Sequence, residues 1–114
     1  ALAPLERRGA VDRELISSYV RPMTTPHGRR WLLRFFGQYR LAPRPELRRG
    51  LGGIGCPTAI VWGRRDRYIP IETPLELARE IPGAELTMID DAGHFVTEES
   101  PAAVTAALRE LLAR

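Results

Sequence analysis

Two side chains that handle protons, an aspartate and a histidine, each follow an apolar run typical of a β-strand. Asp66 comes after residues 58–62 and the turn glycine Gly63, and His94 comes after residues 86–89. Open α/β sheets build their sites at the carboxyl ends of parallel strands, so neighbouring strands would bring both side chains to one edge. An acid followed by a histidine matches the last two members of a Ser–Asp–His relay. In such a relay the acid orients the histidine, which acts as the general base.

Each of these side chains also has a plainer interpretation. Asp66 alone is typical of a turn aspartate that hydrogen-bonds its own backbone, and His94 alone is typical of a loop histidine with a local hydrogen bond. The pair favours the catalytic interpretation, because one crossover would place both loops at the same sheet edge. Asp90 and Asp91 compete as partners of His94, but they precede Gly93, and we expect that turn to point them outward.

The second half of the chain predicts alternating strands and helices that would position the two motifs. Residues 73–76, Thr-Pro-Leu-Glu, combine a capping box with proline at the first helical position, and Pro82-Gly83 ends this helix. With the flanking strands it forms one βαβ crossover. Ser100-Pro101 opens a last helix. Glu98 and Glu99 lie just upstream of it, where their negative charges interact favourably with the positive N-terminus of the helix. The expected buried face of that helix consists of Val104, Ala107, Leu108, Leu111 and Leu112.

The first half predicts two helices. Asp12 caps a helix over residues 12–20, which Pro22 prevents from continuing. Thr25 caps the second helix, with Pro26 at its first position. An aromatic face on this second helix is a candidate lining for an apolar substrate pocket, although such faces more often serve as core packing. The pocket candidates are Trp31, Phe35, Phe36 and Tyr39.

Composition narrows the functional classes. The 114 residues are 44% hydrophobic, which suits one small domain or part of a larger one. All 17 basic residues are arginines, and they are scattered, so we expect no nucleic-acid partner. The single cysteine, Cys56, suits a reducing compartment, and neither a membrane span nor a signal peptide is apparent, so we expect a cytoplasmic protein with no membrane partner. No ligand spacing suggests a metal, and residues 51–55 lack the pattern of a phosphate loop, so we expect no cofactor.

Three segments resemble the C-terminal half of an α/β-hydrolase. Residues 56–70, CPTAIVWGRRDRYIP, resemble the family's late strand, its Gly-x-x-Asp acid turn and the proline after it. Residues 81–86, IPGAEL, are similar to its helix end and last core strand, and residues 91–101, DAGHFVTEESP, to its histidine loop. Residues 10–45 are similar, less specifically, to the helical cap inserted into that fold.

The resemblance implies an α/β class and a partial α/β-hydrolase fold. It divides the chain into a helical cap segment over residues 1–45, a linker over 46–55, and the C-terminal part of the core over 56–114. It makes Asp66 the triad acid and His94 the triad base of an enzyme that hydrolyses an ester, epoxide, halide or carbon–carbon bond in a small apolar substrate.

The family's nucleophile turn, Gly-x-Ser-x-Gly or an aspartate version of it, is absent from this sequence. The serines are Ser17, Ser18 and Ser100, and none lies in such a turn. We therefore expect a fragment that is inactive alone, with the N-terminal half of the fold or a second copy as its partner. The alternative is a non-catalytic remnant of the same fold that serves as an interaction module.

Overall fold

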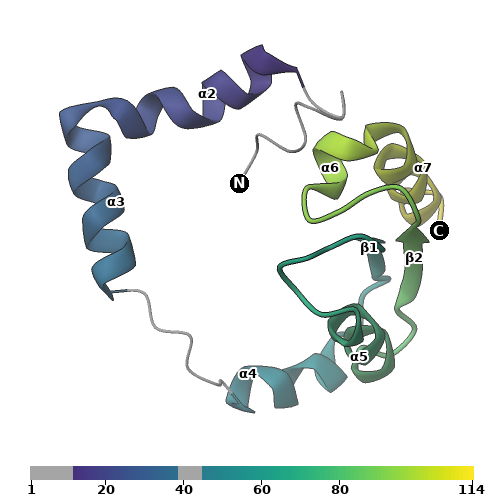
Figure 1. Cartoon of the computed structure of the whole chain (residues 1–114). Helices are drawn as coiled ribbons and strands as arrows, with labels where there is room; N and C mark the ends of the chain where they lie inside the picture. Colours follow the sequence, from purple (N-terminus) through teal and green to yellow (C-terminus); the bar gives the residue numbers. More distant parts are fainter. Residues whose placement is uncertain (1–11, 39–44) are drawn as a thin grey trace. The chain divides into compact units, whose positions relative to one another are not determined.

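The computed structural model describes residues 12–38 and 45–114 (Figure 1). The chain divides into two compact units, residues 1–43 and residues 44–114. Tyr39, one of the pocket candidates, lies outside the described residues. Among the residues that the structure describes, no helix is both long enough and apolar enough to cross a bilayer.

The first unit begins with helix α2, Arg13–Thr24, which continues through Pro22. Asp12 caps it as predicted, since its Oδ1 accepts a hydrogen bond from the Leu15 amide at 2.6 Å. The predicted end before Pro22 is wrong. Only two helical residues follow the proline, so the lost hydrogen bond lies close to the helix end, and the Thr25 hydroxyl donates to the Pro22 carbonyl at 2.9 Å.

The start of helix α3, Pro26–Gln38, agrees with the prediction. The hydroxyl oxygen of Thr25 accepts a hydrogen bond from the Gly28 amide at 3.0 Å, and Pro26 is the first helical residue. Gly28 also explains how closely the two helices meet. A Cβ at this position would lie 2.0 Å from the carbonyl oxygen of Pro22, so only glycine fits there.

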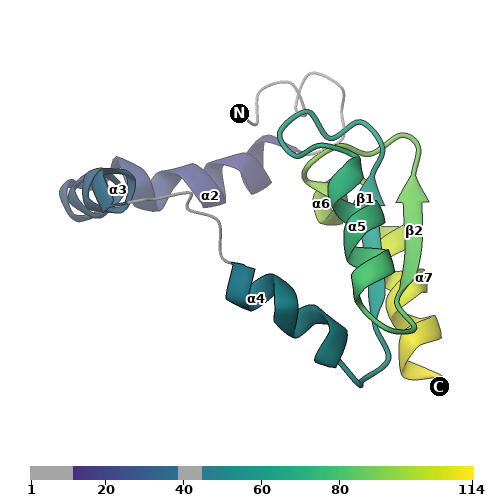
Figure 2. The same ribbon diagram turned by 90° about the horizontal axis from the view of Figure 1, so that it is seen from below.

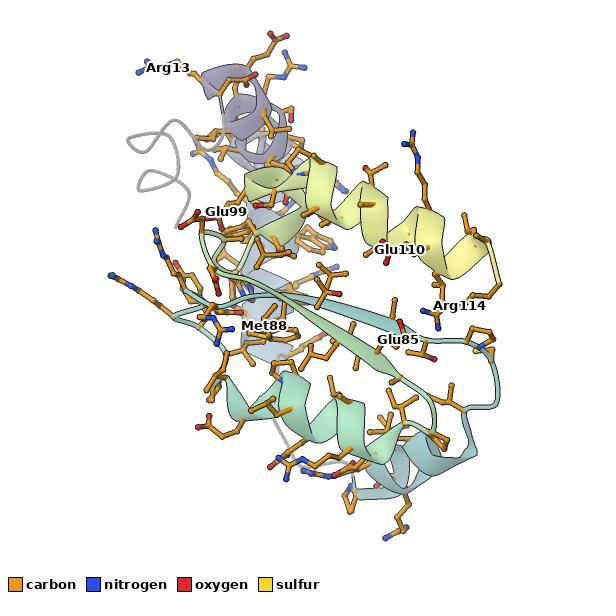
Figure 3. The ribbon with its side chains drawn as sticks, turned by 90° about the vertical axis from the view of Figure 1, so that its right-hand side faces the viewer. Arg13, Glu85, Met88, Glu99, Glu110 and Arg114 are labelled. Atoms are coloured by element: carbon orange, nitrogen blue, oxygen red, sulfur yellow. The ribbon has the colours of Figure 1, made fainter. Side chains whose placement is uncertain are left out.

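The second unit contains a two-stranded parallel sheet (Figure 2). Strand β1, Ala59–Gly63, pairs with β2, Glu85–Ile89, from Ala59 opposite Glu85 to Gly63 opposite Ile89. Helix α5, Glu72–Glu80, connects the strands and completes the predicted βαβ crossover. After β2 come α6, Val96–Glu99, and α7, Pro101–Leu112. Figure 3 shows the strands between α5 on one side and α7 on the other.

Helix α5 begins earlier than the sequence predicts, and the capping box is not formed. Ile71 is the residue before the helix, and no side chain caps it. Pro74 is therefore the third helical residue, and it is fully buried. Proline is tolerated throughout a first turn because the amides there have no partner inside the helix. The helix stops before Pro82 as predicted, and Gly83 takes the left-handed conformation with φ of 70°.

The predicted buried face of α7 is only partly correct. Val104, Ala107 and Leu111 are half-buried, but Leu108 is 52% exposed and Leu112 is 77% exposed. Two strands form a sheet too narrow to cover the whole apolar face of a twelve-residue helix. Of the described apolar residues outside glycine and proline, Ile81 and Ala92 are the buried ones.

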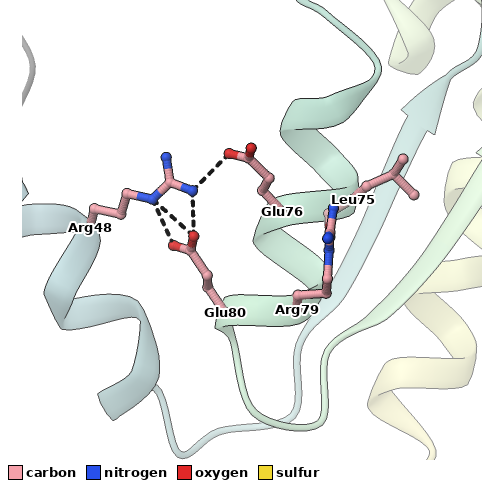
Figure 4. Close-up of polar contacts among 5 residues, drawn as sticks. All are labelled: Arg48, Leu75, Glu76, Arg79 and Glu80. Atoms are coloured by element: carbon pink, nitrogen blue, oxygen red, sulfur yellow. Dashed lines mark hydrogen bonds and ion pairs between the residues drawn. The ribbon is translucent and has the colours of Figure 1, made fainter.

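The expected linker over residues 46–55 overlaps helix α4, Pro45–Gly50, and contains the 3-10 turn η1, Leu51–Gly53. Proline at the first position starts the helix. The guanidinium of Arg48 then joins α4 to α5, with Nε 2.9 Å from Glu80 Oε1 and Nη2 2.7 Å from Glu76 Oε2 (Figure 4). These contacts make α4 part of the second unit.

Candidate active site

The turn after β1 holds Asp66 by its backbone and by one carboxylate oxygen. The Asp66 amide donates to the Gly63 carbonyl at 3.1 Å. Asp66 Oδ1 accepts hydrogen bonds from the amides of Tyr68 at 2.8 Å and Ile69 at 3.0 Å. The side chain is only 4% exposed. The plain turn interpretation is therefore correct for Oδ1, and it leaves Oδ2 for another partner.

That partner is His94. Its Nδ1 lies 2.9 Å from Asp66 Oδ2, within the 2.6–3.2 Å expected of a hydrogen-bonded acid and base. An ionised carboxylate only accepts hydrogen bonds, so Nδ1 carries the proton and donates it. Nε2 is then the ring nitrogen that can accept a proton from a reacting group. The His94 side chain is 35% exposed, so the ring is accessible while its acid is buried.

The surroundings of Asp66 keep it ionised at neutral pH. Burial pushes the pKa of its carboxyl upward. The hydrogen bond with His94 and those from the amides of Tyr68 and Ile69 together outweigh burial, so the pKa of Asp66 lies below its usual value. A negative charge at this position favours the Nδ1-protonated ring and stabilises an imidazolium when one forms.

Backbone contacts bring the two loops together beyond the ends of the strands. The Arg64 amide donates to the Ile89 carbonyl at 2.9 Å, and the Arg65 amide donates to the Ala92 carbonyl at 2.9 Å. Gly63 makes this approach possible. A Cβ there would lie 2.1 Å from the carbonyl oxygen of Gly93 and 2.6 Å from the carbonyl carbon of Ala92.

We expect Gly63→Ala to separate the loops and to destabilise the fold by about 1–3 kcal/mol or more, because backbone atoms cannot move aside as a flexible side chain would. Gly53→Ala is the matched control, since a Cβ at Gly53 meets nothing within 4 Å. Urea unfolding of the two variants measures the difference. Equal stabilities would show that the close contact at Gly63 does not constrain the loops.

Comparison with known proteins assigns the family. The sequence model described as the alpha/beta hydrolase family matches residues 1–108. The chain belongs to the alpha/beta hydrolase family. The partial fold of the second unit, a parallel βαβ crossover followed by a C-terminal helix, is consistent with this assignment.

Individual relatives are hydrolases. The chain is 39% identical to the 2-hydroxy-6-oxononadienedioate/2-hydroxy-6-oxononatrienedioate hydrolase of Klebsiella pneumoniae over 70 residues, 61% of this chain and 24% of that protein. It is 29% identical over 94 residues to the uncharacterized hydrolase YugF of Bacillus subtilis, 82% of this chain and 33% of that protein. Among solved structures, a predicted CIB-like hydrolase from Thermoplasma acidophilum superposes with a TM-score of 0.56 at 30% identity, covering 59% of this chain and 32% of that one. The chain thus spans about a quarter to a third of the length of these relatives.

The competing acids of this α/β hydrolase chain point away from the histidine, as the sequence led us to expect. Asp90 pairs with Arg64 Nε at 2.5 Å, and Asp91 pairs with Arg65 Nη2 at 2.7 Å. Their side chains are 77% and 86% exposed. Asp66 is thus the acid that the structure places against His94.

Two aromatic rings beside His94 were not singled out from the sequence. The Tyr68 ring centroid lies 5.0 Å from that of His94 and the Phe95 centroid lies 5.2 Å away. Both belong to the motifs themselves, so their closeness to Asp66 and His94 along the chain is a signal that could have identified them. Both rings therefore lie beside the His94 imidazole.

The pocket candidates that the structure describes lie on α3, in the other unit. The rings of Trp31 and Phe35 are stacked with centroids 5.3 Å apart, and Phe36 meets Phe35 edge-on at 5.4 Å. All three side chains are exposed within the described part of the chain. They form one continuous aromatic face.

Among the described residues, no cluster of three or more His, Cys, Asp or Glu side chains could hold a metal ion.

Proposed function

We propose that this chain supplies the acid and the base of the catalytic triad of a hydrolase. Asp66 is the acid and His94 is the base. The observation that carries the proposal is the 2.9 Å contact between Asp66 Oδ2 and His94 Nδ1, made by a buried carboxylate and an accessible ring. In this mechanism Nε2 takes a proton from the nucleophile or from water and returns it to the leaving group, while Asp66 stabilises the imidazolium.

In our proposal the nucleophile comes from a segment outside these 114 residues. Ser18 is an unsuitable candidate, because its hydroxyl donates to the Leu15 carbonyl within helix α2 at 2.7 Å. Two features of the second unit support packing against further chain, whether the N-terminal part of the fold or a second copy. The apolar side chains of Leu108 and Leu112 are exposed, and the buried indole N–H of Trp62 has no partner among the described residues.

The reaction depends on that nucleophile. A serine would give acyl transfer through a covalent intermediate, and an aspartate would give displacement at carbon. The candidate scissile bonds are therefore an ester, an epoxide, a carbon–halogen bond or a carbon–carbon bond. Because several relatives are named as 2-hydroxy-6-oxononadienedioate hydrolases, that dioate belongs in the first panel of substrates.

The test compares the complete protein, expressed from its natural start codon, with the 114-residue chain alone. We expect the complete protein to hydrolyse at least one member of a panel of nitrophenyl esters, epoxides, haloalkanes and the dioate. We expect the 114-residue chain to show no turnover that depends on His94. A folded complete protein that is inactive throughout the panel would favour the alternative of a non-catalytic interaction module.

We also propose that the aromatic face of α3 bounds a pocket for a small apolar substrate, because small-molecule sites are mostly apolar with a few placed polar groups. Phe35→Ala and Phe36→Ala in the complete protein should then change the preferred chain length of nitrophenyl esters at unchanged fold. Leu33→Ala is the control, since Leu33 is 75% exposed on the same helix. If stability falls by about 3–5 kcal/mol while preference is unchanged, these rings are core residues instead.

A further inference from the structure

Glu99 holds the backbone of the residue that follows His94. Phe95 precedes helix α6, and its carbonyl accepts a hydrogen bond from the Glu99 amide at 2.9 Å. The Phe95 amide in turn donates to Glu99 Oε1 at 3.2 Å. Glu99 therefore contacts both polar groups of the Phe95 backbone, and it shares the carbonyl with the Glu98 amide, which donates to it at 3.0 Å. Figure 3 labels Glu99 where α6 follows the loop.

The same carboxylate lies against the residue that precedes His94. A Cβ added at Gly93 would be 3.1 Å from Glu99 Oε1 and 3.6 Å from Oε2, and 3.4 Å from the Arg65 carbonyl oxygen. Gly93 is buried in this contact. Glu99 thus hydrogen-bonds the backbone after the histidine and lies close to the residue before it, and the direction of the His94 side chain follows from that backbone.

The sequence around α6 explains why such a contact is needed. Phe95 occupies the N-cap position, where serine, threonine, aspartate or asparagine usually supplies a side-chain oxygen, and it makes no side-chain cap. A capping box places a glutamate that reaches back to the N-cap amide at the third helical position, whereas here Glu99, the fourth helical residue, makes that contact. This contact binds the N-cap amide, which lies one residue after the histidine.

We propose that Glu99 is a positioning residue that sets the orientation of the His94 ring toward Asp66. The contact needs an acceptor oxygen at the right reach, but it does not need a charge. This distinguishes it from the general preference for acidic residues near a helix N-terminus, which depends on the charge. The consequence for catalysis rests on the function proposed above, whereas the effect on the ring geometry does not.

The experiment measures the hydrogen bond between Asp66 and His94 in the complete protein without substrate. The Nδ1 proton of His94 and the ring nitrogen shifts are followed by NMR with ¹⁵N-labelled histidine, and His94→Gln assigns the signals. We expect Glu99→Gln to keep the Nδ1–H signal, since the amide oxygen still accepts from Phe95. Glu99→Ala and the shorter Glu99→Asp should broaden or lose that signal. Glu98→Ala is the matched control on the same helix and should leave it unchanged.

Steady-state kinetics provide a second readout where the complete protein is active. A misplaced base should lower kcat by up to about a hundredfold with little change in KM, and Glu99→Gln should restore most of it. A protein without turnover would contradict the proposed function and leave the NMR result to decide the role of Glu99.

Two results would overturn the inference. One is an unchanged Nδ1–H signal in folded Glu99→Ala. The other is a Glu99→Gln protein that loses the signal, because an uncharged acceptor oxygen at the right reach would then not be sufficient. If circular dichroism shows that the alanine variant does not fold, the comparison of glutamine with aspartate decides, because the inference requires these two variants to differ.

Discussion

Replacing His94 with alanine in the complete protein is expected to lower kcat by on the order of a million-fold, the size of effect seen when the histidine of an established triad is removed. The physical reason is that His94 Nε2 is the proposed proton acceptor. The 2.9 Å contact between His94 Nδ1 and Asp66 leaves Nε2 available for this role. Steady-state assays on the best substrate of the panel measure the loss.

His27→Ala is the control for this experiment. It removes the other histidine of the sequence, an exposed residue in the first turn of α3. We expect its activity to match the wild type. If the His94→Ala protein keeps its activity within tenfold of the wild type and its circular dichroism spectrum is unchanged, His94 is excluded as the general base.

The contact between Asp66 and His94 was predictable because each half of it is encoded locally. Each residue follows a short apolar strand and a tight turn, and a parallel crossover is sufficient to bring two such turns to the same edge. The predicted βαβ unit is confirmed by the register of β1 and β2. The turns predicted at Gly63 and Gly83 are also present, because the residues that form a tight turn are adjacent in the sequence.

Contacts that depend on partners far along the chain could not be predicted from the sequence. Within the expected linker over residues 46–55, Arg48 reaches carboxylates on α5 that no local pattern reveals. The sequence predicts a start of α5 two residues too late, because proline fits anywhere in a first turn and so does not fix the position of the cap.

The role of Glu99 was hidden for a different reason. An acidic residue before a helix has a sufficient explanation in the helix dipole, and the sequence gives no sign that this side chain turns back to the Phe95 amide. The contact with Gly93 is likewise visible only when the backbone is folded. A glutamate five residues after a loop histidine is therefore worth testing for this contact in other chains.

The second large effect is expected from Asp66→Asn, with a loss of about ten-thousand-fold in kcat. The asparagine oxygen can still accept from the amides of Tyr68 and Ile69, so the turn should keep its shape. Its amide group would then face His94 Nδ1 as a donor, which favours the ring with its proton on Nε2. That tautomer cannot accept a proton from a nucleophile. Steady-state kinetics and the ring nitrogen shifts of His94 measure the change.

Asp90→Asn and Asp91→Asn are the matched controls, because these carboxylates pair with Arg64 and Arg65 at the surface.

The stability of Asp66→Asn gives an independent check. Since the folded-state pKa of Asp66 is lowered, its charge stabilises the wild type above the ordinary carboxyl pKa of about 3.9, and that contribution is lost as the pH falls through the lowered folded value. Urea unfolding should therefore show the largest difference between wild type and Asp66→Asn near neutral pH and a shrinking one below pH about 4. A difference that stays constant down to acid pH would mean that the Asp66 charge is not what holds His94.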